Sequence, residues 1–364
     1  MIGLFERLTL PFFHRFEPED AHRLALRALQ WAPLPPARAD DARLRVRAFG
    51  LNFPNPIGVA PGFDKNAEVP DALLRLGFGF VEIGTVTPRP QAGNQRPRLF
   101  RLDADQAVIN RLGFNNEGEA QVLQRLARRA GKKGLVAVNV GANRDSEDRA
   151  ADYARLVEAF APVASYITIN VSSPNTPGLR NLQEAKSLDD LLARAIEARD
   201  RVLPRSGPTP LLLKIAPDVS LGELDDIVGV ARRRKVDGMI VGNTTLSRPP
   251  SLRERTKAQE QGGLSGKPLF RLSTRVLAET YVRLEGVMPV IGVGGIDSGE
   301  AAVAKIRAGA SLIQVYSALV FHGMSLLPDI KQGLLAALER GKHQTLADLT
   351  GTDAADITAQ EWPS

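Results

Sequence analysis

Short runs of apolar and β-branched residues, each followed by a longer segment with helical spacing, recur from about residue 55 to residue 336. This alternation predicts βαβ units, in which parallel strands form a sheet and helices cover it. The candidate strands are residues 57–60, 80–84, 135–140, 166–171, 211–215, 238–241, 289–293 and 312–316. Eight units favour a closed barrel over an open doubly wound sheet, and no G-x-G-x-x-G sequence opens any of the expected helices. We therefore predict an α/β fold, a (β/α)8 or TIM barrel.

Two connections are too long to be simple loops between a strand and a helix. Residues 96–113 contain alternating segments at 99–102 and 107–110, which predict a β-hairpin over the mouth of the barrel. Residues 246–269 are rich in Gly, Arg and Glu, and we expect a surface excursion between the sixth and seventh strands. We expect three parts: a helical extension over residues 1–40, the barrel over 41–340 and a polar, peripheral tail over 341–364.

The N-terminal 40 residues differ from the rest of the chain. Their aromatic residues, set among arginines, are Phe5, Phe12, Phe13, Phe16 and Trp31. Pro18 with two acids predicts a helix start and the proline-rich residues 33–36 predict its end, so we expect two short amphipathic helices. The aromatic side chains could pack on the barrel or enter a membrane surface beside anionic lipid, and composition alone leaves both readings open.

Composition removes several kinds of site and partner. The chain has 364 residues and no cysteine, which excludes disulfides, thiolate metal sites and a cysteine base. Its four histidines show no ligand spacing, so we expect no metal. The net charge of +6 comes from arginines interspersed with acids, so no nucleic-acid partner is expected.

Glu6 and Arg7 interrupt the apolar N-terminus, which argues against a signal peptide. No run approaches the ~20 apolar residues of a membrane span.

Polar residues end most of the candidate strands, where the functional groups of a parallel barrel lie. These endings are residues 60–66 and 84–88, Asn139, residues 170–178, Lys214 and residues 243–245. A single asparagine after a strand is usually a turn or helix cap. Amide, lysine and hydroxyl endings on six strands together suit a planar heterocycle with carbonyl and imide groups, because Asn both donates and accepts hydrogen bonds.

Glycine-rich segments accompany the last two strands. Residues 262–266 precede the seventh strand, residues 292–296 end it, and Tyr316 and Ser317 end the eighth. Backbone amides freed by glycine, together with a helix N-terminus, form a phosphate site after strands seven and eight of many barrels. The pattern therefore predicts a cofactor with a phosphate group, and FMN is the economical choice.

Six segments, in this order along the chain, resemble the dihydroorotate dehydrogenases. They are residues 64–65 (DK), 84–90 (GTVTPRP), 110–116 (NRLGFNN), 170–180 (NVSSPNTPGLR), 243–245 (NTT) and 292–298 (GVGGIDS). The resemblance extends over about residues 15–335. It implies a barrel with one FMN per chain that oxidises dihydroorotate to orotate in pyrimidine synthesis.

The resemblance also implies a catalytic base. In this family a base removes the C5 proton while hydride leaves C6 for flavin N5; the soluble class uses cysteine and the quinone-linked class uses serine. This chain has no cysteine, and Ser173 falls on the serine position. Ser172 is expected to point elsewhere, because side chains alternate along an extended segment. Ser173 is therefore the expected base, and the quinone-linked class is the expected one.

The remaining site residues follow from the same resemblance. Cofactor contacts are expected from Ala60, Pro61, Gly62, Phe63, Asp64, Thr85, Asn139, Asn170, Lys214, Gly242, Gly266, Gly295, Tyr316 and Ser317. Contacts with the pyrimidine and its carboxylate are expected from Lys65, Asn110, Arg111, Leu112, Gly113, Phe114, Asn170, Asn175, Asn243 and Thr244. Lys214 would stabilise negative charge on the reduced ring. Two positions depart from the family: Gly242 replaces a hydroxyl residue, and Pro61 replaces a small residue and removes an amide donor.

In the quinone-linked class an N-terminal extension of this size forms the quinone tunnel and the membrane-docking surface. Residues 18–22 match it, and His22, Arg101 and Tyr316 are expected to line the quinone path. The resemblance thus predicts a monomer held peripherally on the cytoplasmic face of the cell membrane, with dihydroorotate and a membrane quinone as partners.

Two alternatives remain. The first is a soluble relative that uses fumarate or NAD; the cysteine-free chain and the aromatic N-terminus argue against it. The second is a flavin- or phosphate-binding barrel that serves as an interaction protein without redox chemistry. Loss of the lysine, the serine or the asparagines would indicate that second role, and all of them are present.

Overall fold

Eight parallel strands close into a barrel in the computed structural model, which describes residues 15–202 and 207–363. The strands are β3 (Ile57–Val59), β4 (Phe80–Val86), β7 (Leu135–Val140), β8 (Ile167–Asn170), β9 (Leu211–Ile215), β10 (Gly238–Val241), β12 (Val290–Val293) and β13 (Leu312–Val315). They pair in chain order, and β13 closes the barrel on β3 with Ile313 opposite Ile57. The predicted (β/α)8 fold is confirmed.

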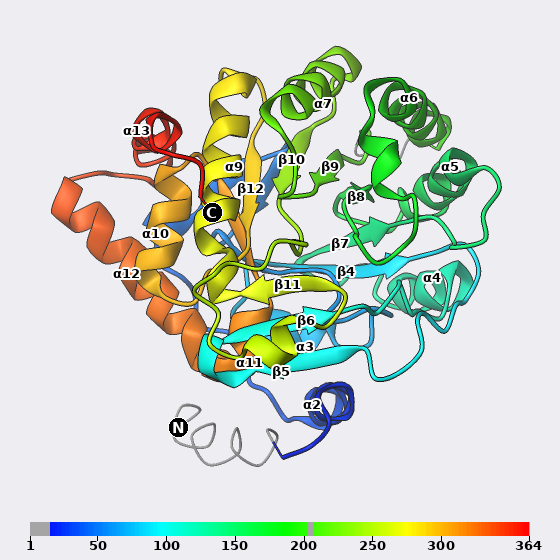
Figure 1. Cartoon of the computed structure of the whole chain (residues 1–364), viewed down its shortest axis with the longest axis horizontal. Helices are drawn as coiled ribbons and strands as arrows, with labels where there is room; N and C mark the ends of the chain where they lie inside the picture. Colours follow the sequence, from blue (N-terminus) through cyan, green and yellow to red (C-terminus); the bar gives the residue numbers. More distant parts are fainter. Residues whose placement is uncertain (1–14, 203–206, 364) are drawn as a thin grey trace.

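Helices surround the barrel in Figure 1. They are α3 (Pro70–Arg75), α4 (Glu119–Ala127), α5 (Arg149–Phe160), α6 (Ala185–Arg201), α7 (Leu221–Arg234), α9 (Phe270–Leu284), α10 (Gly299–Arg307) and α12 (Leu326–Gly341). Several begin at side-chain caps; Ser220 and Glu223 form a capping box at the start of α7. Each helix buries an apolar stripe against the strands, and this contact makes the main core.

The barrel interior is layered. Its lower layer is an apolar cluster that includes Phe80, Tyr166 and Leu212, closed from below by the hairpin β1 (Val46–Ala48) and β2 (Leu51–Phe53). Two residues further along the strands the side chains become polar. These residues are Glu82, Asn139, Thr168, Lys214 and Gln314, all buried. Because side chains alternate along a strand, the polar layer lies toward the carboxyl ends of the strands, where a barrel places its site.

The predicted hairpin over the barrel mouth is present. Strands β5 (Leu99–Leu102) and β6 (Ala107–Asn110) pair antiparallel. The second long connection does more than follow the surface, because it supplies α8 (Arg255–Ala258) and then β11 (Gly263–Gly266), which pairs with β6. The result is a three-stranded sheet in the order β11-β6-β5. Sequence reasoning missed β11 because a strand of two glycines, a leucine and a serine has no strand-like composition.

One helix of the N-terminal extension lies within the described residues. It is α2 (Pro18–Trp31), which packs against β5 at the edge of the molecule in Figure 1. Glu17 caps it and Pro18 occupies its first turn, as the sequence predicts. The other expected helix, with Phe5, Phe12 and Phe13, lies outside the described residues. Among the residues that are described, no helix is long and apolar enough to span a membrane.

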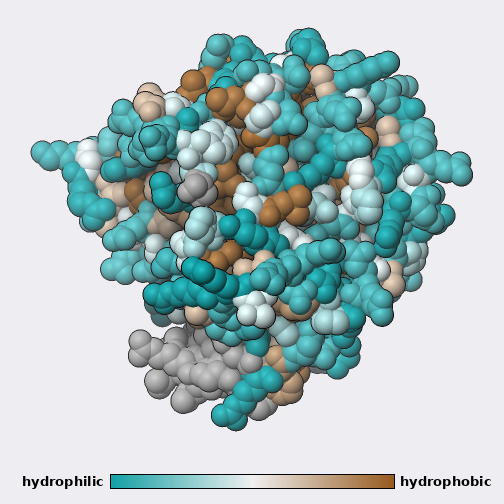
Figure 2. Space-filling view, in the orientation of Figure 1, coloured by the Kyte–Doolittle hydropathy of each residue, from teal (hydrophilic) through white to brown (hydrophobic). Residues whose placement is uncertain are grey.

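The C-terminal residues pack on the barrel helices. They contain η6 (Leu346–Asp348) and α13 (Ala354–Ala359), which contacts α9. Arg275 of α9 donates hydrogen bonds to the carbonyl oxygens of Ile357 and Thr358. The face drawn in Figure 2 is mostly hydrophilic, with hydrophobic residues in patches toward its centre. The remaining short elements are η1 (Ala42–Leu44), η2 (Asp103–Asp105), η3 (Arg180–Gln183), η4 (Lys267–Leu269), α11 (Ser317–His322) and η5 (Gly323–Ser325).

Candidate active site

A cavity of about 960 Å³ joins the barrel mouth to α2. At one end it is lined by polar residues at the carboxyl ends of the strands, which are Thr85, Asn170, Ser173, Asn175, Lys214, Asn243 and Thr244. At the other end its lining comes from one face of α2, which supplies Ala21, His22, Ala25, Ala28 and Leu29. The cavity is continuous, so a group bound in its middle could meet one molecule from the barrel side and another from the α2 side.

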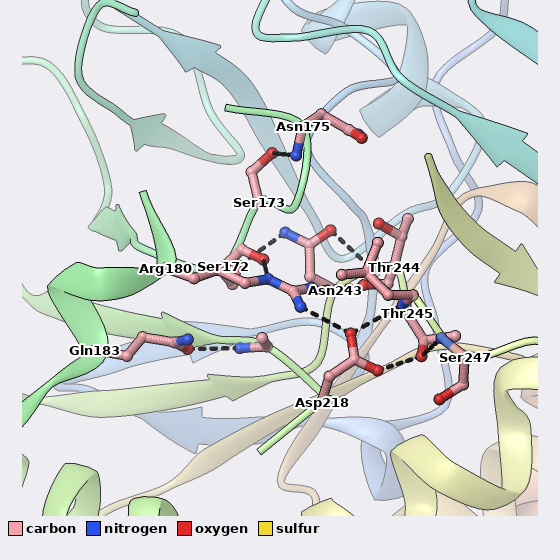
Figure 3. Close-up of polar contacts among 12 residues, drawn as sticks. Ser172, Ser173, Asn175, Arg180, Gln183, Asp218, Asn243, Thr244, Thr245 and Ser247 are labelled. Carbon is pink, nitrogen blue, oxygen red and sulfur yellow. Dashed lines mark hydrogen bonds and ion pairs between the residues drawn. The ribbon is translucent and has the colours of Figure 1, made fainter. Parts of the chain in front are cut away.

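Two adjacent serines follow β8, and they point in different directions. Ser173 lines the cavity, and its Oγ accepts a hydrogen bond of 3.3 Å from the amide of Asn175 (Figure 3). Ser172 is fully buried; its Oγ donates to Asn170 Oδ1 at 2.7 Å and accepts from Asn243 Nδ2 at 2.7 Å. Ser173 is therefore the serine that can meet a ligand, as the alternation of side chains predicts.

Arg180 fastens the serine loop to its neighbours. Its guanidinium donates to Ser172 O at 3.1 Å, to Asp218 Oδ2 at 2.8 Å and to Thr244 O at 3.1 Å (Figure 3). Asp218 also accepts a hydrogen bond from the Thr245 hydroxyl. A planar guanidinium with several fixed donors can hold three groups in one geometry. The loop after β8 and the loop after β10 therefore keep a fixed spacing beside the cavity.

A buried carboxylate fixes the orientation of the site asparagines. Glu82 accepts hydrogen bonds from Asn139 Nδ2 at 2.8 Å, Tyr166 Oη at 2.9 Å and Gln314 Nε2 at 2.5 Å. Because an ionised carboxylate only accepts, Asn139 must turn its NH₂ toward Glu82 and its oxygen toward the cavity side.

Further hydrogen bonds fix the orientation of the next side chains, Asn170 and Ser172. Asn139 Oδ1 accepts from Thr85 Oγ1 at 2.6 Å and from Asn170 Nδ2 at 3.0 Å. Asn170 must then direct its oxygen toward Ser172, whose amide and hydroxyl both donate to it. Each amide orientation follows from the one before. The chain from Glu82 to Asn243 thus sets which polar atoms face a ligand.

Two lysines bring positive charge to the site. Lys214 ends β9 and lines the cavity; burial lowers its pKa, and the negative charge of Glu82 opposes that shift. Lys65 donates to Gly62 O at 3.0 Å, and its pKa falls to about 8, mainly through loss of hydration. Both side chains can meet an anion or an electron-rich ring, but near pH 8 only part of the Lys65 population is charged.

Glycines shape one wall of the cavity into a cradle. Gly266, Gly294 and Gly295 have φ values of +92°, +103° and +72°, which other residues adopt rarely. A Cβ on Gly295 would lie 2.5 Å from Phe270 Cα, so the turn packs directly on the start of α9. Nearby, Ser317 Oγ and Ser265 Oγ form a hydrogen bond of 2.8 Å. Amides and hydroxyls gather here without bulky side chains, as a phosphate requires.

Three aromatic rings, one of them on α2, pack together in the cavity wall. The ring of His22 lies 5.2 Å from that of Phe63 and 6.1 Å from that of Tyr316. The Nε2 of His22 is 2.8 Å from Phe63 O. Burial and then the charge of Lys65 lower the pKa of His22 to about 4, so the ring is neutral near pH 7.

Comparison with known proteins identifies the family. The profile of the family described as dihydroorotate dehydrogenase matches residues 43–338. The chain belongs to this family. A protein of Rhodopseudomonas palustris (strain BisB5) named dihydroorotate dehydrogenase (quinone) is 68% identical over 363 residues, covering 100% of both chains. A Bradyrhizobium protein (strain ORS 278) of the same name is 67% identical, with 100% of both chains covered.

Solved structures of family members have the same fold. The DHODH of Eimeria tenella in complex with ferulenol is 38% identical, with a TM-score of 0.89 over 93% of this chain and 96% of that one. The ligand-free form is 39% identical, with a TM-score of 0.88 over 92% and 99% of the two chains. The resemblance read from the sequence motifs is therefore confirmed at the level of family and fold.

Most of the residues that the motifs single out for this family meet at the cavity. Those that line it are Ser173, Ala60, Pro61, Gly62, Phe63, Thr85, Asn170, Lys214, Gly266, Gly295, Tyr316, Ser317, Lys65, Asn110, Leu112, Gly113, Phe114, Asn175, Asn243, Thr244, His22 and Arg101. Their positions in the sequence extend from residue 22 to residue 317, and the closed barrel with its hairpin brings them together.

Four of the expected contact residues do not line the cavity. Asp64 accepts from the amides of the following turn, and burial raises its pKa to about 6. Asn139 does not reach the cavity, but it hydrogen-bonds to Thr85 and Asn170, which do. Arg111 points outward to Glu260, 2.7 Å away, with its guanidinium over Phe100. Gly242 adopts φ +154°, near the extended region, and offers no side chain.

Sequence reasoning missed several residues of the site. Gln314 lines the cavity, and Glu82 organises it from below. Each is a polar residue within an otherwise apolar strand. Such a residue in a buried run is the feature of the sequence that could have indicated a role in the site. Arg180 and Asp218 lie 38 residues apart in the sequence, and no local pattern indicates that they pair.

Proposed function

We propose that this protein is an FMN-dependent dihydroorotate dehydrogenase that oxidises (S)-dihydroorotate to orotate and passes the electrons to a quinone. The observation that supports it best is the single cavity with two chemically different ends. Ser173 and the asparagines lie at the end suited to a pyrimidine, and α2 lines an apolar end suited to a quinone. The relatives at 67–68% identity are named for this activity.

The residues present fit a flavin mononucleotide. The glycine cradle with Ser265 and Ser317 suits the phosphate, and Lys214 suits the electron-rich side of the ring. Buried polar atoms of Thr244 (Oγ1) and Gln314 (Oε1), both residues of the cavity wall, have no hydrogen-bond partner among the described residues. Buried polar groups are nearly always paired, so these atoms point to a ligand. When bound, the flavin accepts hydride from the pyrimidine and returns two electrons to a quinone.

The protein's own groups then prepare the pyrimidine for oxidation. Lys65 would hold the carboxylate, and Asn110, Asn175 and Asn243 would hold the ring edges through amides whose orientation is fixed. Ser173 would take the proton from C5 as the bond to hydrogen at C6 breaks, which leaves a C5–C6 double bond. Serine is a weak base, so its hydroxyl proton has to leave through a hydrogen-bonded neighbour in a site closed from bulk water.

The N-terminal end would face the membrane. Trp31 is 86% exposed, and Phe16 and Leu24 are also exposed on or beside α2. We propose that this helix rests on the lipid surface of the cytoplasmic face and admits the quinone between itself and the barrel, past His22, Arg101 and Tyr316. An amphipathic helix with arginines on its polar side is suited to that position.

Orotate formation with alternative electron acceptors tests the proposal. The purified holoenzyme should produce orotate from dihydroorotate with a short-chain ubiquinone analogue, and much more slowly with fumarate or NAD. Turnover with fumarate or NAD in place of quinone would place the protein with the soluble relatives. A flavin-containing protein that forms no orotate with any acceptor would support the interaction-protein alternative.

A further inference from the structure

Lys305 is a fully buried lysine behind the glycine cradle. It lies on α10, and its side chain is 0% exposed. Its Nζ donates to Ser273 Oγ at 2.6 Å and lies 5.1 Å from the centre of the Phe270 ring. It does not line the cavity, so nothing in the proposed reaction uses it directly.

The charge of Lys305 has no acidic partner within the described residues. Burial alone drives its pKa well below the ordinary value, with no carboxylate to oppose the shift. An isolated ammonium in a protein interior is costly unless an anion or a set of acceptors compensates for lost hydration. One hydroxyl and one aromatic face offer partial compensation. No described residue therefore supplies the negative charge that a protonated Lys305 would attract.

Ser273 connects this lysine to the cradle. A protonated Nζ can only donate, so Ser273 Oγ accepts from it and turns its own hydrogen to a carbonyl oxygen. Three carbonyl oxygens are within reach, those of Gly294 at 3.0 Å, Leu269 at 2.9 Å and Phe270 at 3.1 Å. A Cβ on Gly294 would lie 2.9 Å from Ser273 Oγ, so the turn and the serine are in direct contact. The Lys305 amine thus lies one side chain behind the wall of the cradle, where a bound anion would favour its protonated form.

We propose that Lys305 is a positioning residue for the flavin phosphate: it braces the Gly294–Gly295 turn through Ser273 and adds positive charge behind the phosphate. This inference rests on the proposed FMN site and assigns to it a residue that makes no contact with the ligand. The attraction acts on the phosphate and not on the oxidised isoalloxazine ring, because the phosphate is anionic and the oxidised ring is neutral. A charge interaction in a buried site extends beyond direct contact.

Comparison of FMN with riboflavin tests the proposal, since riboflavin lacks the phosphate. The flavin-free full-length chain is titrated with each flavin, and binding is followed by quenching of flavin fluorescence. Lys305→Met keeps the side-chain length and removes the charge. We expect it to weaken FMN binding about tenfold or more and to leave riboflavin binding within about twofold of the unsubstituted chain.

Two further variants keep the test decisive. Lys331→Met is the matched control, because Lys331 is a largely buried lysine with its own carboxylate partner, Asp40, 2.6 Å away. It should leave the binding of both flavins unchanged. Ser273→Ala keeps the charge but breaks the link to the turn, and it should weaken FMN binding by a smaller factor, again without affecting riboflavin.

The outcomes separate the two proposals. Unchanged FMN binding in Lys305→Met, or equal losses for FMN and riboflavin, would overturn the role of Lys305 while leaving the FMN site intact. Should Lys305→Met fail to fold, the same criterion applied to Ser273→Ala decides the matter. If the unsubstituted chain binds neither flavin, the proposed function itself fails.

Discussion

At the scale of single residues, the adjacent serines Ser172 and Ser173 have different roles: the first holds neighbouring side chains in place, and the second faces the cavity. Ser172 is committed to Asn170 and Asn243, whereas Ser173 lies in the cavity wall. We expect Ser173→Ala to lower kcat by about 10²–10⁴, the range for loss of a general base, while the flavin stays bound. Steady-state orotate formation and the flavin spectrum measure both effects. A kcat within about threefold of the unsubstituted enzyme would exclude Ser173 as the base.

Lys65 should give the enzyme an alkaline limit. Its pKa of about 8 is lowered from 10.5, so the ammonium that would bind the substrate carboxylate is lost as the pH rises through 8. We expect kcat/KM for dihydroorotate to fall above that pH, because kcat/KM reports groups of the free enzyme. Lys65→Arg should move the fall to higher pH, since arginine keeps its proton. A fall that stays at the same pH in this variant would assign it to another group.

The sequence predicts which residues lie at the cavity well where a motif places them at a strand end. It does less well where the role depends on a side chain's direction. Arg111 and Asn110 are neighbours in one motif, yet Asn110 lines the cavity and Arg111 pairs with Glu260 outside it. Glu82 stands out as a polar residue in an apolar strand, but its hydrogen-bond partners, like the surroundings of Lys305, come together only in the folded chain.

At the scale of elements, α2 is held to the barrel by a cluster of ion pairs. Glu19 accepts from Arg98 at 2.7 and 2.9 Å and pairs with Arg96 at 2.8 Å. Burial opposes ionisation of Glu19, but its bonds to the two arginines outweigh burial and lower its pKa to about 2. The stabilisation is therefore complete above about pH 4.5 and is lost as the pH falls from there toward 2.

Glu19→Gln should loosen α2 and disturb the quinone end of the cavity. We expect a higher KM for the quinone analogue, because α2 lines that end of the cavity. The KM for dihydroorotate should not change when it is measured near pH 6, where Lys65 stays charged even without the carboxylate of Glu19. Asp20→Asn is the matched control; its exposed carboxylate pairs with Arg23 and, at 3.4 Å, with Arg96, and such exposed pairs should contribute little. Equal effects of both variants, or an altered KM for dihydroorotate, would contradict a separate quinone end.

Strands and helices with strong periodicity could be predicted from the sequence, and elements defined by pairing could not. The barrel strands and the hairpin β5–β6 appear where the pattern places them. Strand β11 forms because Gly263–Gly266 meets β6, a partner more than 150 residues earlier, through backbone bonds that any sequence can make. The hairpin β1–β2 also escaped notice, although Phe53 closes the floor of the barrel against Phe80.

At the scale of the whole molecule, the exposed apolar residues of α2 predict attachment to membranes. We expect the full-length protein to sediment with vesicles that contain anionic phospholipid. Trp31→Ser should weaken that binding and leave turnover with a soluble quinone analogue unchanged. Val287→Ser, at a residue 60% exposed outside α2, serves as the control. Undiminished vesicle binding in Trp31→Ser would remove α2 from the membrane contact.

The two ends of one cavity should serve two separate half-reactions, and rapid mixing under anaerobic conditions can follow each of them. Reduction of the bound flavin by dihydroorotate and reoxidation of chemically reduced enzyme by quinone are followed separately. We expect Ser173→Ala to slow only reduction and Glu19→Gln to slow only reoxidation. Variants that each slow both steps alike would contradict the separation of the two ends.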